Sequence, residues 1–306
     1  MVKTYVFGHK SPDTDTITSS IVMANLERQL GNTEAKAYRL GNLNKETQYV
    51  LDYLDIEAPE LLETIEDDAN VILVDHNSPK ESVENLENAN IQKIVDHHKV
   101  AFNTSYPLYV RIEPVGCTQT ILYKLYKENN IEITPKIAFL MLSAIISDTL
   151  LLKSPTTTPE DIQTVEELNE LIDEDYQEYG LEMLKAGTDL STFTIPEILK
   201  LDAKQIDLKD KKSIINQVNT ASIDDVMQMK EELEDEMQKI IKEEELDLFM
   251  LLITDIINSN SQVIVLGEHA DIVEKAYDVK LEDNTALLED IVSRKKQVVP
   301  IMTKHA

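Results

Sequence analysis

The sequence is poor in several kinds of residue, and each shortage narrows the class of protein. Cys117 is the only cysteine among 306 residues, so the chain cannot form an internal disulfide and we expect a reducing, cytoplasmic environment. Only 29 lysines and arginines stand against 57 acidic residues. The resulting formal charge of −28 opposes nonspecific binding to a phosphate backbone, so we predict no nucleic acid partner.

Long hydrophobic runs are also missing. The most apolar stretch, residues 137–152, is too short to span a membrane and contains Asp148. The first apolar run stops at His9, unlike the charged and then apolar pattern of a secretion signal. We therefore predict a soluble protein with no membrane partner. Its hydrophobic fraction of 42% can support ordinary cores, and its length favours two domains over one.

The first half of the chain alternates short apolar runs with helix-like segments. This pattern predicts an α/β domain built on a doubly wound, mainly parallel sheet. The predicted strands are residues 4–8, 70–77 and 91–98. A helix is expected over about Thr16–Leu30, with Gly31 placed where a left-handed residue commonly ends a helix.

The periodic pattern breaks around residues 185–197, where small and polar residues gather. We predict a linker at 188–195. It would separate an N-terminal domain, residues 1–187, from a smaller C-terminal α/β domain, residues 196–306, with a mixed sheet.

The C-terminal domain is predicted to contain one long helix and a hairpin. Apolar residues recur at helical spacing over residues 224–245, and we interpret Met229 and Met237 in this stripe as core residues rather than metal ligands. Two apolar runs around the turn NSNS, within residues 246–268, predict the hairpin.

Histidines and aspartates gather just past the ends of the predicted strands. They are His9, Asp13 and Asp15 after the first, Asp75 and His76 after the second, and Asp96, His97 and His98 after the third. Asp148 follows the apolar run 137–146, and we expect it at a strand end as well. Because the carboxyl ends of parallel strands lie along one edge, these side chains are predicted to converge. The two remaining histidines, His269 and His305, are interpreted as surface residues.

Such a cluster predicts a metal site. Carboxylates brought together without a cation repel one another, and divalent ions relieve that cost. Aspartate and histidine without cysteine suit Mn²⁺, Co²⁺ or Fe²⁺, although zinc is not excluded by affinity. Four aspartates and two histidines exceed the needs of one ion and suit two ions bridged by a carboxylate. Taken alone, Asp13 or Asp15 would be read as a helix N-cap.

Further segments extend the pattern over nearly the whole chain. They are GHKSPDTDT, ILVDHN, VDHH, EPVGCTQTIL, LMLSAIISDTLLLKSPT, LDAK and SRKKQVVP, between residues 8 and 300. Together they resemble the DHH phosphoesterase superfamily, and within it the manganese-dependent, family II inorganic pyrophosphatases. The resemblance implies a homodimeric hydrolase that splits pyrophosphate, with a DHH metal-binding catalytic domain at 1–187 and a DHHA2-type substrate-binding domain at 196–306.

The resemblance also implies the metal ligands. One Mn²⁺ would be held by His9, Asp13, Asp75 and Asp148, and a second by Asp15 and His97 with Asp75 and Asp148 shared. Asp96 would orient ligands from behind by hydrogen bonds. Co²⁺ would be a possible substitute, and Mg²⁺ would arrive with the substrate.

The remaining implied residues bind substrate or act in the reaction. The substrate-binding residues are His98, Lys204, Arg294 and Lys295, and the catalytic ones are His98, Asp75 and Asp148. In our hypothesis two ions lower the pKa of a bridging water, whose hydroxide attacks one phosphorus in line. Arg294 would bind phosphate oxygens as a fork, whereas Lys296 would point away if its segment is extended. By itself, the run 293–297 would be a solvated surface segment.

Three other functions compete with this reading. An exopolyphosphatase, or another DHH phosphoesterase acting on short phosphate chains, would share the metal centre. A nuclease-like relative would need a glycine-rich C-terminal motif, but the chain has only 7 glycines and none cluster there. A non-catalytic regulator is disfavoured because every matched ligand position is intact.

Overall fold

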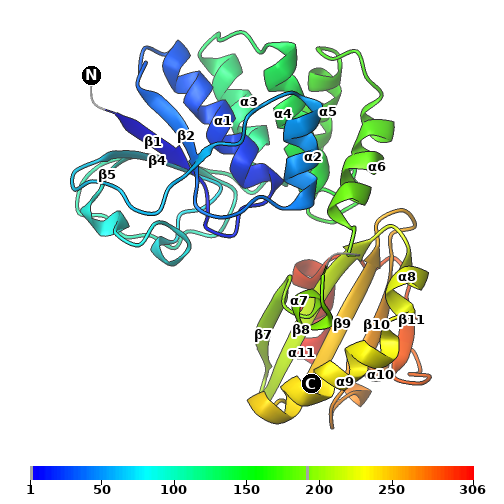
Figure 1. Cartoon of the computed structure of the whole chain (residues 1–306). Helices are drawn as coiled ribbons and strands as arrows, with labels where there is room; N and C mark the ends of the chain where they lie inside the picture. The colour runs from blue at the N-terminus through cyan, green and yellow to red at the C-terminus, as the bar shows by residue number, and fades with distance from the viewer. Residues whose placement is uncertain (1–2, 191–192) are drawn as a thin grey trace. The chain divides into compact units, whose positions relative to one another are not determined.

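The computed structural model describes residues 3–190 and 193–306, which form two compact units, Met1–Gly187 and Thr188–Ala306 (Figure 1). Each unit contains one sheet with helices packed on it, so the mixed α/β class predicted from the sequence is confirmed. Residues 191–192 of the predicted linker 188–195 lie outside the described residues, and the linker stays a prediction.

The N-terminal unit is built on six parallel strands in the order β3-β2-β1-β4-β5-β6. Their bounds are β1 (Thr4–Phe7), β2 (Ala35–Arg39), β3 (Glu60–Leu61), β4 (Asn70–Val74), β5 (Asn90–Asp96) and β6 (Tyr109–Ile112). The order reverses between β1 and β4, as it does in doubly wound sheets, where ligands bind at that switch point. The parallel sheet predicted for this half is thereby confirmed.

Helices and turns cover this sheet. The helices are α1 (Thr14–Gln29), α2 (Lys45–Tyr53), α3 (Thr118–Glu128), α4 (Pro135–Asp148), α5 (Pro159–Asn169) and α6 (Tyr176–Gly187). α1 packs on β1 and β2, while Tyr5 and Phe7 belong to a cluster with Val83 and Leu86 near the short turns η1 (Pro79–Glu81) and η2 (Leu86–Asn88). α1 starts at Thr14 because Asp13 caps it, and Gly31 adopts the expected left-handed φ of 101°.

The strand end expected before Asp148 is wrong. Asp148 is the last residue of α4, which Thr134 caps and Pro135 begins. This helix packs against α1, α3 and α5, and residues 137–146 are all buried and, except for Ser143, apolar. A short apolar run without polar alternation cannot distinguish a buried helix from a buried strand.

The C-terminal unit has a five-stranded mixed sheet in the order β11-β10-β9-β8-β7. Its strands are β7 (Ala203–Leu208), β8 (Lys211–Thr220), β9 (Leu248–Asp255), β10 (Asn260–Leu266) and β11 (Thr285–Leu288). Only β8 and β9 pair in parallel among these described strands; the other neighbours are antiparallel. The predicted hairpin is therefore confirmed as β9 and β10.

The single long helix predicted over residues 224–245 is wrong. The helices of this unit are α7 (Ile195–Ile198), α8 (Ile223–Met227), α9 (Lys230–Glu244), α10 (Asp271–Tyr277) and α11 (Val299–His305). The chain turns between α8 and α9, yet Val226, Met237 and the partly buried Met229 all contact one core cluster. Packing on the sheet thus interrupts the helix while keeping its apolar positions inside, and the core assignment of the methionines is confirmed.

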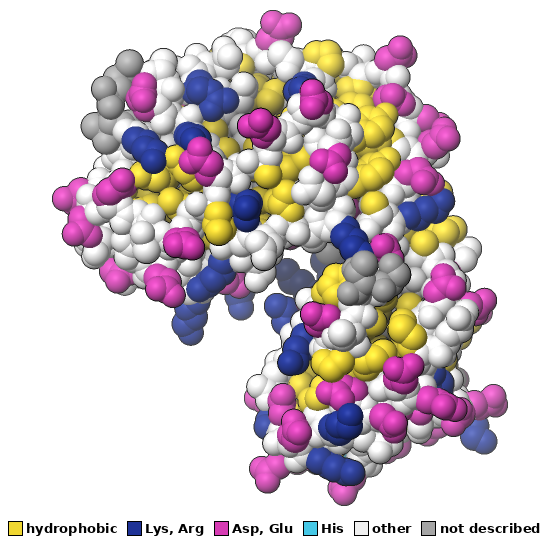
Figure 2. Space-filling view, viewed as in Figure 1, with side chains coloured by type: hydrophobic (Ala, Val, Ile, Leu, Met, Phe, Trp, Pro, Cys, Tyr) yellow, Lys and Arg dark blue, Asp and Glu magenta, His cyan; other side chains and the backbone are white. Residues whose placement is uncertain are grey.

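The acidic excess lies mainly on the surface. In the face shown in Figure 2, aspartate and glutamate side chains are scattered over both units instead of forming one patch. This distribution agrees with solvated helix faces. Among the residues that the structure describes, no helix is long and apolar enough to cross a membrane.

Candidate metal centre

The predicted ligands meet at the carboxyl edge of the parallel sheet, beside its switch point. β1 ends just before Gly8 and His9, β4 ends at the residue before Asp75, and β5 ends at Asp96, before His97. Asp13 and Asp15 come from the start of α1, and Asp148 from the end of α4. Strand ends and helix ends together therefore build the site.

Three groups of side chains bring possible ligand atoms within 4.8 Å of one another. The groups are His9 with Asp13 and Asp75, Asp15 with His97 and Asp148, and Asp75 with His97 and His98. All six side chains proposed as metal ligands occur in them. Among the described residues, Asp96 belongs to none of these groups.

Asp75 belongs to the first group and also faces His97 of the second. Its Oδ2 is 3.4 Å from Nε2 of His9, and its Oδ1 is 3.5 Å from Nε2 of His97. The hydroxyls of Thr16 and Thr118 donate to Oδ2 and Oδ1 at 2.6 and 3.2 Å. A left-handed backbone, with φ of 55°, turns this side chain into the cluster. One carboxylate thus offers an oxygen to each side, as a bridging ligand must.

Neighbouring polar groups hold the other ligands. Asp15 is buried and accepts hydrogen bonds from the hydroxyl of Ser19 at 2.7 Å and the backbone N–H of Thr118 at 2.8 Å. Nδ1 of His97 lies 3.1 Å from the carbonyl oxygen of Val115, which leaves Nε2 facing Asp75. Such partners fix the orientation of a ligand before a metal binds.

His98 is held by Asp96. Its Nδ1 lies 2.9 Å from Oδ1 of Asp96, whose other oxygen accepts from the Asn77 side-chain amide. Asp96 is fully buried, whereas the His98 side chain is 44% exposed. The imidazole is therefore anchored on one side and open on the other.

The charges of this cluster are poorly balanced. Burial and the charge of Asp75 raise the pKa of Asp15 to about 7, and burial and Asp15 raise the pKa of Asp148 well above its usual value. Burial would also raise the pKa of Asp75, but hydrogen bonds from His9 and His97 outweigh it and keep that pKa low. Burial lowers the pKa of the two imidazoles, yet the carboxylates outweigh it and raise the pKa to about 11 for His9 and about 10 for His97.

This donor set fits divalent metal ions. Oxygen and imidazole ligands without thiolate suit Mn²⁺ and related ions, and a cation would relieve the repulsion that keeps Asp15 and Asp148 from ionising. Cys117 is buried and burial raises the pKa of its thiol, so it is a poor ligand. Asp148 shares a group with Asp15 but, within the described residues, none with His9, so its sharing between two ions stays a prediction.

Two of the predicted substrate-binding cations of the C-terminal unit, Lys204 on β7 and Arg294 in a later turn, are connected through β8. Arg294 donates to Oδ1 of Asp202 at 2.8 Å and to the carbonyl oxygen of Ile215 at 3.3 Å. Ile215 is paired across the two strands with Lys204, which is exposed. Lys295 is exposed as well. Arg294 therefore contacts the β8 residue that is paired with Lys204 of β7.

Lys296 was expected to point away from Arg294 and Lys295 only if its segment were extended, and the segment is not extended. Residues Arg294–Val298 form a π-helical turn, η3, in which Ser293 accepts from the backbone N–H of Lys296. Alternation of side chains applies to strands and does not apply to this turn.

Sequence reasoning missed the groups that hold the ligands. They are Thr16, Ser19 and Thr118 around the carboxylates, Asn77 behind Asp96, and Asp202 beside Arg294. Hydroxyl residues are frequent in the segments DTDTITSS and GCTQT, and that enrichment was the available signal. Which hydroxyl meets which carboxylate depends on contacts between segments far apart in the chain.

The chain is similar to known proteins over nearly its whole length. The DHH family, N-terminal domain, matches residues 3–145, and the DHHA2 domain matches residues 181–305. The chain is 53% identical over 305 residues to the manganese-dependent inorganic pyrophosphatase of Bacillus subtilis, covering 99% of this chain and 98% of the relative. It is also 53% identical over 305 residues to the probable manganese-dependent inorganic pyrophosphatase of Staphylococcus saprophyticus, covering 99% of both.

A solved structure gives the same result. The crystal structure of a Methanococcus jannaschii protein, provisionally named a family II inorganic pyrophosphatase, is 38% identical in sequence and superimposes with a TM-score of 0.77, covering 99% of both chains. These likenesses span both units and the whole set of candidate ligands. The chain belongs to the family of manganese-dependent inorganic pyrophosphatases.

Proposed function

We propose that this protein hydrolyses inorganic pyrophosphate to two phosphates, using manganese ions held by its aspartate and histidine cluster. The observation that carries this proposal is Asp75, whose two oxygens face His9 and His97 and so join two groups of metal ligands. The names of the full-length relatives at 53% identity, both manganese-dependent inorganic pyrophosphatases, support this substrate.

Two ions per subunit account best for the ligand groups. His9, Asp13 and Asp75 would hold one, and Asp15, His97 and Asp148 the other, with Asp75 and Asp148 shared. When bound, the ions would supply a water of lowered pKa as the nucleophile and positive charge beside the phosphoryl oxygens. Co²⁺ is the expected substitute, and Mg²⁺ would enter bound to the substrate phosphates.

His98 is the proposed proton or hydrogen-bond donor to the substrate. Because the Nδ1–H of His98 donates to Asp96, the exposed imidazole presents Nε2, and in the imidazolium form Nε2–H can donate to a phosphoryl oxygen. The hydrogen bond that Asp96 accepts also favours a single ring orientation. Asp75 and Asp148 would serve catalysis by keeping the ligand groups at a fixed spacing.

Arg294, Lys204 and Lys295 are the proposed phosphate-binding residues. Pyrophosphate hydrolysis needs fixed positive charge around the departing phosphate. Asp202 and the Ile215 carbonyl orient the guanidinium of Arg294. Residues 1–187 would thus provide the catalytic domain and 196–306 the substrate-binding domain, joined by the linker 188–195.

The proposed assembly is a cytoplasmic homodimer joined through the N-terminal unit. β6 is an edge strand of the parallel sheet, and its Tyr109 and Val110 are 44% and 41% exposed. An edge with unpaired backbone groups and apolar side chains is suited to pairing with a second copy. The lone buried thiol of Cys117 agrees with a reducing compartment.

The test is phosphate release by protein preloaded with Mn²⁺. Pyrophosphate, tripolyphosphate and a short oligonucleotide are compared at equal phosphate concentration. We expect pyrophosphate to be split fastest and the oligonucleotide not at all. Faster release from tripolyphosphate would favour a polyphosphatase, and no release from pyrophosphate would contradict the proposal.

A further inference from the structure

Glu46 is a half-buried carboxylate outside the three ligand groups, yet it is bonded to the elements that carry them. It lies in the first turn of α2. Its Oε1 accepts hydrogen bonds from the hydroxyl of Thr14 at 2.6 Å and from the hydroxyl of Ser147 at 2.5 Å. One oxygen atom therefore joins the start of α1 to the end of α4.

These two hydroxyl residues are direct neighbours of candidate ligands. Thr14 stands between Asp13 and Asp15, and Ser147 immediately precedes Asp148. The hydroxyl of Thr47, next to Glu46 on α2, lies 3.2 Å from the hydroxyl of Thr14 and adds a second contact. Glu46 is therefore hydrogen-bonded to the direct chain neighbours of three candidate ligands.

Packing from α6 keeps Glu46 in place. A Cβ built on Gly187, the last residue of α6, would lie 2.8 Å from Cβ of Glu46, so the two backbones approach closely there. Tyr179 of α6 is hydrogen-bonded to Ser143 of α4 at 2.8 Å, one turn before Ser147. α6 therefore contacts both the carboxylate and the helix that it holds.

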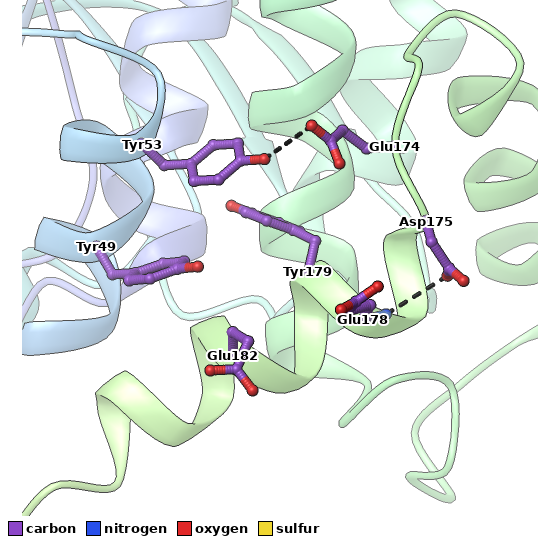
Figure 3. Close-up of a pocket in the computed structure, with 7 residues that line it drawn as sticks. All are labelled: Tyr49, Tyr53, Glu174, Asp175, Glu178, Tyr179 and Glu182. Atoms are coloured by element: carbon purple, nitrogen blue, oxygen red, sulfur yellow. Dashed lines mark hydrogen bonds between the residues drawn. The ribbon is translucent and has the colours of Figure 1, made fainter.

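Aromatic rings also pack between α2 and α6. Figure 3 shows Tyr49 and Tyr53 of α2 beside Tyr179, with ring centroids 6.1 and 5.0 Å from that of Tyr179. These rings line a cavity of about 280 Å³ whose acidic rim contains Glu178 and Glu182 but not Glu46. Since Glu46, Tyr49 and Tyr53 recur at helical spacing, one face of α2 carries both the carboxylate and the aromatic contacts.

We infer that Glu46 is a positioning residue that sets the separation between Asp13 and Asp15 on α1 and Asp148 on α4, and thereby tunes the affinity for metal. This inference rests on the proposed metal site. Among the described residues, Glu46 belongs to none of the three ligand groups, and it would act through the hydroxyls of Thr14 and Ser147. Loss of a direct hydrogen-bond partner of a ligand typically weakens metal binding by about 10- to 100-fold. Glu46 is one bond further from the ligands but supports the segments of three of them at once, so we expect a loss within that range.

The experiment measures Mn²⁺ binding to metal-stripped protein by calorimetric titration, together with the melting temperature of each stripped variant. Glu46→Ala removes the shared acceptor and is expected to raise the Mn²⁺ dissociation constant by about 10- to 100-fold. Glu46→Gln keeps an oxygen at the position of Oε1 and is expected to bind Mn²⁺ within a few-fold of the parent. Asp52→Ala, at an exposed position of the same helix, is the control for lost charge and should bind as the parent does.

Thr14→Val and Ser147→Ala keep the test decisive if Glu46→Ala does not fold. Each removes one donor, so each should weaken Mn²⁺ binding less than Glu46→Ala and the two losses should combine. Parental affinity in Glu46→Ala, with only its melting temperature lowered, would overturn the inference. A parent protein that binds Mn²⁺ but releases no phosphate from pyrophosphate would overturn the proposed function alone.

Discussion

The ligand cluster of the N-terminal unit differs in its charge balance from the basic residues of the C-terminal unit. These basic residues, Lys204, Arg294 and Lys295, are called the basic corner below. In the first, Asp15 and Asp75 are buried together, and neighbouring carboxylates and burial make their joint ionisation unfavourable. In the second, Arg294 already has a counter-charge in Asp202, and Lys204 and Lys295 are exposed to water.

This difference in charge balance suits the two regions to different roles. The ligand cluster is incomplete without a cation because its own charges conflict. In the basic corner, Arg294 is already paired with Asp202, so its orientation does not depend on an added anion. We therefore expect substitutions in the first region to change metal binding, and those in the second to change the kinetics with pyrophosphate while bound metal stays at the parental content. The following predictions are ordered by the size of the expected effect.

The largest effect is expected from Asp75→Ala. Because this carboxylate faces both His9 and His97, its loss should remove bound manganese and lower the rate of phosphate release by well over about 100-fold, more than the loss of an outer partner costs. Bound metal is measured by elemental analysis after dialysis. Asp68→Ala, at an exposed left-handed position, is the control for charge, and activity within a few-fold of the parent at saturating Mn²⁺ would contradict the two-metal account.

Arg294→Ala should lower kcat/KM by about 100-fold, the usual cost of removing one donor to a developing oxyanion, while bound manganese stays at the parental content. Arg294→Lys should restore only part of the rate because a lysine cannot bind phosphate as a fork. Lys239→Ala, an exposed cation on α9, controls for lost charge. An equal loss of metal in Arg294→Ala would remove the distinction between the two regions.

Asp202→Ala tests how much the counter-charge of Arg294 contributes to substrate binding. Asp202 is partly exposed, so its ion pair with Arg294 should contribute no more than an exposed pair does, and we expect KM to rise about twofold to fivefold. Steady-state kinetics with pyrophosphate measures the change. A fall in KM would instead mean that Asp202 competes with phosphate for Arg294.

The smallest effect is a pH dependence of stability in the metal-stripped protein. The folded-state pKa values of His9 and His97, about 11 and 10, exceed the ordinary 6.5, so the stability they contribute is complete below pH 6.5 and is lost as pH rises through 10 to 11. Asp15, with a pKa of about 7 in place of 3.8, acts in the same direction.

Melting temperatures between pH 6 and pH 9 should therefore decline in chelator. Saturating Mn²⁺ should flatten this decline, because bound metal keeps its ligands deprotonated. A decline of equal slope with and without Mn²⁺ would locate its cause outside the ligand cluster.

Much of the candidate site could be predicted because buried parallel strands have a clear sequence pattern. β4 is apolar from Val71 to Val74 before Asp75, and β5 ends in the buried pair Ile94 and Val95 before Asp96, so the sequence indicates where both strands end. Parallel strands bring such ends to one edge of the sheet. Asp148 was assigned to the wrong kind of element because α4 is apolar on all sides. The break between α8 and α9 was missed because both segments keep helical spacing on one core.

The sequence by itself determined the donor chemistry, aspartate and histidine without reactive thiol, and the strands at whose ends most of these donors lie. Only the tertiary structure decided that Asp75 divides its oxygens between His9 and His97, and that Glu46 holds the start of α1 to the end of α4. The physical reason is distance. Metal ligation and hydrogen bonding require placement within a fraction of an ångström, and that placement comes from sheet register and helix packing between residues far apart in the chain.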